Sequence, residues 1–277
     1  MELIKCSYCG ADWSLVIVFL VQQICVQGQS FQQPGQTLPL NLGAYRNQTT
    51  SPFSAALRPA AGTFIPKKAI GLYAENRFML KRVADIQGAV SIPVQSILLS
   101  LSAHYRGTSF LSTQSIGAGI GFKLSPRLST GINISSHWLT INSVAPLHSM
   151  VVAGGLLYKI NEKVLWGIHI RKGTPTNKMQ KSSIENIALI GGIGYTLNKQ
   201  LLLAFEISAS SIHQLDAVAG IEWWANDNIH FRAGVHNPLS NLFIGVGVKG
   251  KHETVNICLS SHTLLGYSGG LLLVHEF

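Results

Sequence analysis

The chain has 277 residues, of which 47% are hydrophobic but only 12% are charged, whereas an ordinary soluble domain carries about 25% charged residues. This composition favours a membrane protein, yet the longest apolar run, residues 15–21, is much shorter than the roughly 18 residues that a spanning helix needs. A closed β-barrel is the other structure that satisfies every backbone group in lipid, and its alternating strands never produce a long apolar run.

Residues 1–28 are predicted to form a cleavable signal peptide. Lys5 precedes the apolar stretch at 14–21, and Val26-Gln27-Gly28 offers a cleavage site with a small residue. The alternative is a single membrane anchor, which the short apolar run disfavours. Three of the four cysteines fall inside this segment and only Cys258 lies outside it, so no disulfide is expected.

Residues 29–68 differ from the rest of the chain. They contain five prolines and little alternation of apolar and polar residues. Because proline cannot donate to a strand ladder, this segment is not expected in a barrel wall. It is predicted either to lie in the periplasm or to fold into the lumen as a hatch.

From residue 69 to residue 277, segments of about ten residues alternate apolar and polar side chains, as transmembrane β-strands do. In the segment 200–210, for example, Leu203 and Phe205 fall on one face, while Glu206 and Ser208 fall on the other. The pattern predicts an all-β fold, a transmembrane antiparallel up-and-down β-barrel of about fourteen strands, or twelve if the first pair is not in the wall. The expected strands are 70–77, 85–93, 96–107, 113–125, 127–139, 148–161, 163–173, 185–199, 200–210, 214–227, 228–237, 241–251, 253–263 and 267–277.

The connections between these strands alternate in length. Tight turns are expected at 93–95, 125–127, 161–163, 198–200, 225–228 and 250–253, and the connections between them are generally longer. Bacterial outer-membrane barrels have short periplasmic turns and longer external loops. The alternation of short and long connections therefore predicts a location in the outer membrane of a Gram-negative bacterium, with the C-terminus on the periplasmic side.

The last strand and several aromatic residues fit a position in the membrane. Gly270, Leu273 and the terminal Phe277 resemble the C-terminal signal that outer-membrane barrels present to their insertion machinery. Trp166, Trp223 and Trp224 lie near expected strand ends and are assigned to an aromatic girdle at the membrane interface, with core packing as the alternative.

Polar and charged residues are expected on the inner face of the barrel. A luminal polar network is predicted from Glu75, Arg77, Glu206, Asp216, Glu222, His230 and Arg232. Opposite charges on adjacent strands can pair, so the lumen is either a polar conduit or an interior that fills itself. Several inward positions are glycines, which leave room for an inserted segment or for a ligand.

No catalytic, metal-binding or cofactor-binding motif is present, and an enzyme is not expected. His104 and Ser102 share one strand face, but no carboxylate lies near them in the sequence to orient the imidazole, so a hydrolase is disfavoured. The formal charge is +9, and removal of residues 1–28, which carry one Lys against one Glu and one Asp, brings it to about +10. Lipid head groups, lipopolysaccharide or acidic proteins are the expected partners, and nucleic acid is not.

Three segments carry a resemblance to a family. The stretches 70–80 (IGLYAENRFML), 88–93 (GAVSIP) and 265–273 (LGYSGGLLL) resemble Bacteroidetes-type barrels of the fatty-acid-transporter type, a group that includes the PorV and PorP/SprF-like proteins of type IX secretion. Relatives of this kind carry a hatch element similar to Asn-Pro-Ala, for which residues 57–61 (LRPAA) are the nearest match.

The resemblance implies a non-enzymatic function. The main hypothesis is an accessory or structural subunit of an outer-membrane complex for protein export or barrel assembly, which would bind other outer-membrane or periplasmic proteins. The alternative hypothesis is a barrel similar to the fatty-acid transporters, for uptake of hydrophobic small molecules.

Overall fold

The computed structural model describes residues 45, 51–80, 83–142, 145–175, 186–211, 215–237, 241–263 and 265–277. The predicted signal peptide and most of the segment 29–50 lie outside these residues, so the predicted boundaries there are not addressed. Within the described ranges, no helix is both long and apolar enough to cross a membrane.

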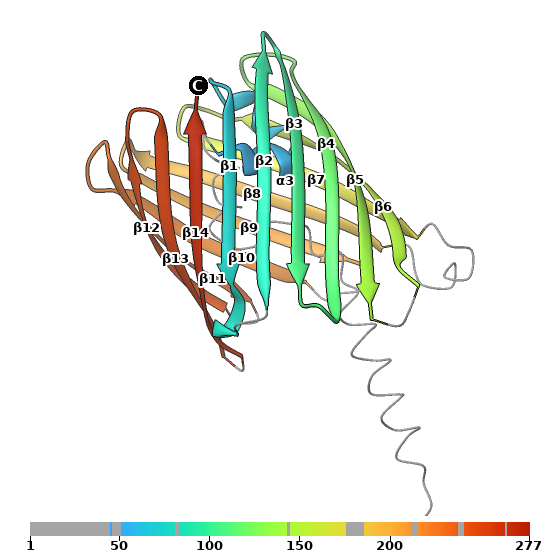
Figure 1. The fold of residues 1–277 in the computed structure, drawn as a ribbon. Coiled ribbons are helices and arrows are strands. Elements are labelled where there is room, and N and C mark those ends of the chain that lie inside the picture. Colours follow the sequence, from blue (N-terminus) through green and yellow to red (C-terminus); the bar gives the residue numbers. More distant parts are fainter. Residues whose placement is uncertain are drawn as a thin grey trace, which may run out of the picture. The chain divides into compact units, whose positions relative to one another are not determined.

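The wall of the structure is a closed antiparallel barrel in which each strand pairs with its neighbours in the chain and β1 pairs with β14 (Figure 1). The fourteen strands confirm the predicted fold and exclude the count of twelve. They are β1 Ala69–Asn76, β2 Ala84–Val94, β3 Ile97–Gly107, β4 Leu111–Lys123, β5 Leu128–Ile141, β6 Leu147–Lys159, β7 Val164–Pro175, β8 Asn186–Asn198, β9 Leu201–Ser210, β10 Asp216–Trp224, β11 Ile229–Asn237, β12 Asn241–Lys249, β13 Glu253–His262 and β14 Gly266–Glu276.

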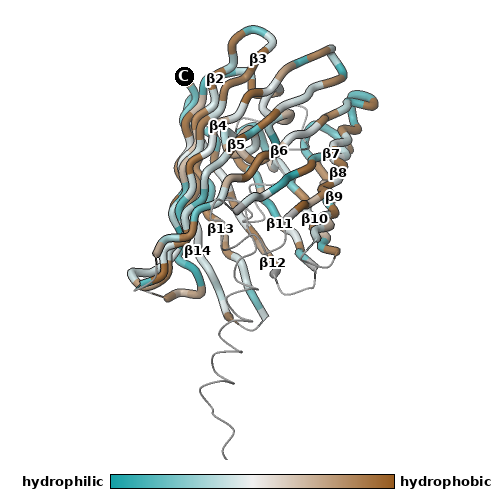
Figure 2. Tube along the Cα trace, turned by 90° about the vertical axis from the view of Figure 1, so that its right-hand side faces the viewer, coloured by the Kyte–Doolittle hydropathy of each residue, from teal (hydrophilic) through white to brown (hydrophobic). Residues whose placement is uncertain are grey.

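Side chains alternate between the two faces of this wall. In β1, buried and exposed residues alternate along the whole strand, and Figure 2 shows the matching alternation of hydropathy along the strands. The outward side chains include large apolar residues such as Ile116 and Ile244, which are 60% and 58% exposed. Because closure of the barrel leaves no unpaired strand edge, such a surface is suited to lipid.

Side chains of Asn and Ser shape several of the tight turns. Asn161 Oδ1 accepts hydrogen bonds from the backbone N–H groups of Lys163 and Val164. Asn198 and Asn226 accept the equivalent pairs in the next two tight turns, and Ser125 Oγ does so in the tight turn before. A short polar side chain that bonds the backbone two or three residues ahead stabilises a tight reversal. The chemistry of these residues thus fixes the short connections, which lie at the end of the barrel that carries the C-terminus (Figure 1).

The described part of the predicted hatch is Tyr45 and residues 51–68, and the barrel encloses it except for the exposed residues 66–68. It contains the helix α3 (Pro52–Leu57) and the 3-10 helix η2 (Ala61–Phe64), and α3 lies between the near and far walls in Figure 1. Pro52 begins α3, where its missing N–H has no helical partner to lose. The 3-10 helix η3 (Arg77–Met79) follows β1 at the opposite end of the barrel.

The hatch supplies much of the buried apolar core. Phe53 and Leu57 pack with residues of β1, β2, β13 and β14. Tyr45, Ala60 and Ala61 pack with Leu157 of β6 and Leu165 of β7. Because these two clusters lie on different groups of strands, the hatch connects separate parts of the wall across the lumen.

Candidate functional site

Glycines on the inner face of the wall make space for the hatch. A Cβ atom added to Gly131 would lie 2.6 Å from the carbonyl carbon of Pro59, and one added to Gly121 would lie 2.6 Å from the Pro59 oxygen. Because these neighbours are backbone atoms, they could not move aside as a flexible side chain does. The ring of Tyr45 occupies the space beside Gly192 in the same way. At these positions the inserted segment, rather than a ligand, fills the room that the glycines leave.

A buried ion pair joins the hatch to the wall. Arg58, the C-cap residue of α3, donates from Nη2 to both carboxylate oxygens of Glu206 on β9, at 2.7 and 2.8 Å. The Tyr45 hydroxyl donates to the same carboxylate at 2.7 Å. Arg58 and Glu206 are 4% and 7% exposed, so this charge-assisted contact is shielded from bulk water.

The electrostatic setting keeps the two hatch donors protonated. Burial, together with the Glu206 carboxylate, raises the pKa of the Tyr45 phenol above its usual range. Burial alone would lower the pKa of Arg58, but its interactions with Glu206 and with Tyr45 together outweigh burial and raise it. Both groups can therefore donate to Glu206 at any physiological pH.

Two inward polar residues of β7 lie close to this ion pair. His169 is buried between the wall and the hatch, and both of its ring nitrogens lack a hydrogen-bond partner in the part of the chain that the structure describes. Arg171 is also buried, and its Nη1 lacks a partner there as well. Arg58 acts electrostatically on both side chains. The lumen beside the hatch thus holds buried polar groups whose hydrogen-bonding capacity is not used by the described residues.

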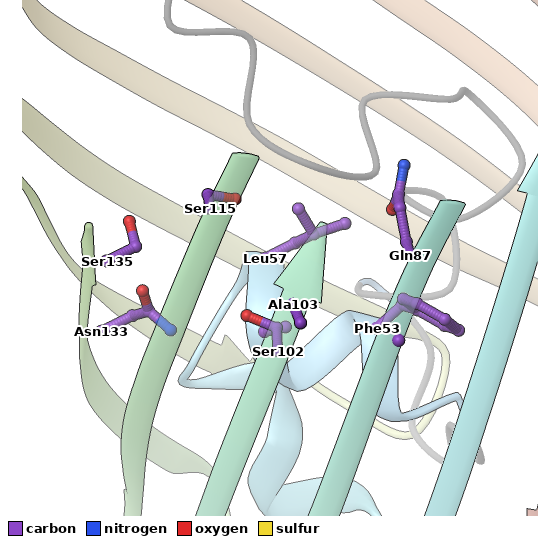
Figure 3. Close-up of a pocket in the computed structure, with 10 residues that line it drawn as sticks. Phe53, Leu57, Gln87, Ser102, Ala103, Ser115, Asn133 and Ser135 are labelled. Atoms are coloured by element: carbon purple, nitrogen blue, oxygen red, sulfur yellow. The ribbon is translucent and has the colours of Figure 1, made fainter. Parts of the chain in front are cut away.

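A small cavity of about 20 Å³ lies between α3 and the wall, with room for about one water molecule. Phe53, Ala56 and Leu57 form its apolar side (Figure 3). Strands β2 to β5 form the opposite, largely polar side, with Gln87, Gly88, Ser102, Ala103, Ser115, Asn133 and Ser135. The cavity therefore has an amphipathic lining, and in this arrangement it is too small for an organic molecule.

A second polar cluster surrounds Asp85 on β2. This fully buried carboxylate accepts hydrogen bonds from Gln87 at 3.0 Å, from His104 at 2.8 Å and from Arg106 at 2.7 Å. The sequence suggested no carboxylate near His104, and the structure corrects this. The register of β2 and β3 sets Asp85 opposite Arg106 and Gln87 opposite His104, which brings the Asp85 carboxylate to the imidazole. Among the hydrogen bonds of the described residues, none joins a serine hydroxyl to His104. The cluster thus links strands β2 and β3, and it lacks the hydrogen-bonded serine that a catalytic triad requires.

The residues of the predicted luminal network form several separate contacts. Glu222 and Arg232 are register partners and form an ion pair at 2.8 Å. Glu206 binds Arg58 from the hatch. The other contacts link Asp216 to His236, His230 to Asn256, and Glu75 to the hydroxyl of Tyr73, while the Arg77 guanidinium lies over the Phe78 ring, 5.2 Å from its centroid.

The predicted interface aromatics do not all share one face. Trp166 and Trp223 point outward and are 42% and 48% exposed, and Trp223 stacks on Phe231. Trp224, in contrast, lies on the inner face, where its indole N–H donates to Glu222 at 2.6 Å and its ring packs on His230. Adjacent residues of a strand face opposite sides, so the assignment of both tryptophans to the girdle is corrected for Trp224.

The residues of the predicted insertion signal all lie at the end of the chain. Gly270 and Leu273 are on β14, and Phe277 follows it with 70% exposure. The backbone N–H of Phe277 donates to the carbonyl of Lys68, next to the start of β1. Their role in insertion stays a prediction.

Three solved structures share this fold at low sequence identity. The CymD monoaromatic hydrocarbon channel has a TM-score of 0.62 and 14% identity, covering 87% of this chain and 97% of its own. The toluene transporter TbuX of Ralstonia pickettii has a TM-score of 0.58 and 12% identity, with 82% and 94% covered. A FadL homologue of Pseudomonas aeruginosa has a TM-score of 0.56 and 10% identity, with 85% and 95% covered. No protein-family model and no curated protein matches the sequence.

These comparisons support an outer-membrane β-barrel and correct the main functional hypothesis. Two of these structures are a toluene transporter and a monoaromatic hydrocarbon channel, and none of the three is named as an enzyme or as a subunit of an export machine. The expectation of an accessory subunit for protein export or barrel assembly is therefore wrong, and membership of the type IX secretion group is not supported. The alternative hypothesis, uptake of hydrophobic small molecules, agrees better with these structures.

The hatch residues that bind the wall were not among the residues predicted from the sequence. Arg58 and Tyr45 lie in a segment without strand periodicity, so nothing predicted which wall residue they would contact. One signal was available in the sequence. Arg58 lies in the proline-containing segment that could form a hatch, and the lumen around such a hatch was predicted to contain carboxylates. Asp85 was missed for a different reason: its partners depend on the pairing of β2 with β3.

Proposed function

We propose that the chain is an outer-membrane channel through which hydrophobic small molecules enter the cell, with the hatch closing the lumen between passages. The observation that carries this proposal is the hatch itself, whose Phe53 and Leu57 form the apolar side of a cavity against a polar wall. An amphipathic lining suits molecules with a large apolar part, whereas an open porin would have a water-filled lumen.

The size of the cavity adds a requirement. At about 20 Å³ it holds about one water molecule and no organic solute, so passage requires the hatch to shift. Among the described residues, the hatch is held inside the barrel by the Arg58–Glu206 ion pair, by the Tyr45 hydrogen bond to Glu206 and by close packing on glycines, and a shift of the hatch would break these contacts. The similar solved structures of a toluene transporter and of a monoaromatic hydrocarbon channel support this class of substrate.

The proposal includes two predictions from the sequence. Residues 1–28 serve as the export signal, and the tight turns with the C-terminus lie on the periplasmic side. The hatch then lies toward the periplasmic half of the lumen, where it controls release of the molecule that enters.

The test is transport in a defined system. Liposomes that contain the full chain should take up labelled toluene faster than empty liposomes, and they should not release an entrapped sugar faster. An equal acceleration of toluene and sugar would identify an open aqueous pore and reject the proposal. Equal toluene uptake with and without the chain would reject it as well.

A further inference from the structure

Exposed basic side chains surround the end of the barrel that carries the tight turns. Most of them lie in or beside the tight turns, and two lie just before β1. Together they are called here the basic rim. Its members are Lys67, Lys68, Lys123, Arg127, Lys163, Lys199 and Lys251. Except for Lys67, whose Nζ lies 3.6 Å from Glu276, none of them forms an ion pair within the part of the chain that the structure describes.

Exposed acidic residues at the same end are fewer. They are Glu162, Asp227 and Glu253. Glu162 is already paired with Lys159 at 2.7 Å, and Glu253 lies 3.3 Å from a ring nitrogen of His275. The rim therefore presents an excess of positive charge, and only its member Lys67 is paired with a carboxylate among the described residues.

The distribution of the basic rim is annular rather than one-sided. Its residues lie beside β1, in the β4–β5, β6–β7 and β8–β9 turns and in the β12–β13 turn. An acidic protein docked on one side of the barrel would reach one or two of these turns. A ring of charge matches a partner that surrounds the barrel, and the surrounding partner of a transmembrane barrel is lipid.

The position of the basic rim along the barrel axis matches the expected level of the lipid head groups. Outward aromatic side chains lie within a few residues of the tight turns at this end. Tyr158 and Trp166 flank the β6–β7 turn, Tyr195 lies before the β8–β9 turn, and Trp223 and Phe231 flank the β10–β11 turn, which itself carries no rim residue. Tyr158 and Trp166 are register partners on adjacent strands, and Trp223 stacks on Phe231. Aromatic side chains favour the membrane–water interface, and the long stems of Lys and Arg can reach the head groups from there.

We infer that the basic rim binds the phosphate groups of anionic phospholipids in the leaflet at the tight-turn end of the barrel. The inference goes beyond the proposed function and rests only on the membrane location and the proposed orientation. A basic residue close to an anionic membrane surface is attracted to it over roughly a Debye length. The ring would thus hold a shell of anionic lipid around the barrel and fix its depth in the membrane.

The experiment compares the lipid shell of the wild type with that of a neutralised rim. The full chain is reconstituted in bilayer discs of phosphatidylglycerol and phosphatidylcholine, and the lipids that remain bound are measured by native mass spectrometry. The rim variant carries Arg127→Gln, Lys163→Gln, Lys199→Gln and Lys251→Gln, four side chains without an ion pair among the described residues. The wild type should retain phosphatidylglycerol above its bulk fraction, and the rim variant should lose this enrichment.

A matched control removes acidic residues from the same end. The variant Glu162→Gln, Asp227→Asn and Glu253→Gln makes the same kind of change with the opposite sign, so its phosphatidylglycerol enrichment should be equal to or above that of the wild type. High salt should weaken the wild-type enrichment, a readout that needs no variant. Wild-type enrichment equal to bulk, or unchanged in the rim variant, would overturn the inference. Retention of lipopolysaccharide but not of phosphatidylglycerol, measured in discs that also contain lipopolysaccharide, would overturn it as well, whereas a failed toluene assay would leave it standing.

Discussion

Arg58 and Glu206 are 148 residues apart in the sequence, yet one guanidinium nitrogen lies 2.7 and 2.8 Å from the two carboxylate oxygens. The pair joins a segment inside the barrel to the wall of the barrel. Because both partners are buried, loss of either one leaves an uncompensated charge in a poorly hydrated place. This contact is therefore the point at which the position of the hatch is most sensitive to substitution.

Replacement of Arg58 by methionine should loosen the hatch. Removing one partner of a buried pair costs about 3–5 kcal/mol, whereas removing both partners together costs much less. We expect Arg58→Met to increase the ion conductance of the chain in planar bilayers and to lower its thermal stability. The double variant Arg58→Met with Glu206→Met should recover most of the stability. Equal destabilisation by the single and the double variant would show that the pair does not hold the hatch.

A single added methyl group on the inner wall should have a similar effect. Gly131→Ala places a Cβ atom 2.6 Å from a backbone carbon of Pro59, so the hatch or strand β5 has to move. Overpacking of this kind costs about 1–3 kcal/mol. Gly191→Ala is the matched control, because nothing lies within 4 Å of the added Cβ there. Protease accessibility of the hatch should rise in the first variant only, and an equal rise in both would contradict this account.

The network around Asp85 should contribute more to the stability of the barrel than to transport. Asp85→Asn removes the charge that His104 and Arg106 face in a fully buried position, and we expect a loss of about 3–5 kcal/mol in unfolding free energy. Asp216→Asn is the comparison, because Asp216 is 37% exposed and its link to His236 is screened by solvent, so a loss below about 1 kcal/mol is expected. Denaturant titration of both variants measures the difference. Similar losses would mean that Asp85 is hydrated in solution.

The attachment of the hatch to the wall should weaken at alkaline pH. Burial raises the pKa of Tyr45 in the closed state, while in an open state the phenol returns to its ordinary value of about 10. A group whose pKa is raised stabilises the closed state fully below the ordinary value, and this stabilisation falls as pH rises above it. Hydrogen exchange of the hatch should therefore accelerate above about pH 10 in the wild type. Tyr45→Phe, which cannot ionise, should show a smaller acceleration, and identical pH profiles would refute the assignment.

The barrel wall could be predicted from the sequence because it depends on local rules. Alternation with period two identifies a strand such as 201–210, and Asn161 or Asn198 identifies a tight turn through its own side chain. The same rule of alternation shows why Trp223 and Trp224 could not both belong to the outer girdle.

The position of the hatch and the polar contacts could not be predicted in the same way. Arg58 meets Glu206 through the path of a segment that has no periodicity, and Asp85 meets His104 through strand register. Register is set by the whole closed barrel, so a single sequence without known contacts leaves such pairs undetermined. The inward glycines were informative only in part, because a glycine shows that space is needed without showing what occupies it.

Enlargement of the cavity should turn the closed lumen into a binding site. Phe53→Ala removes a ring from the apolar side of the cavity and leaves space next to Leu57, because the wall behind it is a closed barrel that cannot collapse. Apolar cavities created by removal of a large side chain bind benzene-sized molecules, and the truncation costs about 3–5 kcal/mol of stability. We expect Phe53→Ala to bind toluene measurably by calorimetry and the wild type to bind it more weakly. Ile70→Ala, on the outward face of β1 and 46% exposed, is the control and should leave toluene binding unchanged. Weaker binding by Phe53→Ala than by the wild type would mean that the ring of Phe53 contacts the ligand directly, and this cavity would then be part of the transport path in the native protein.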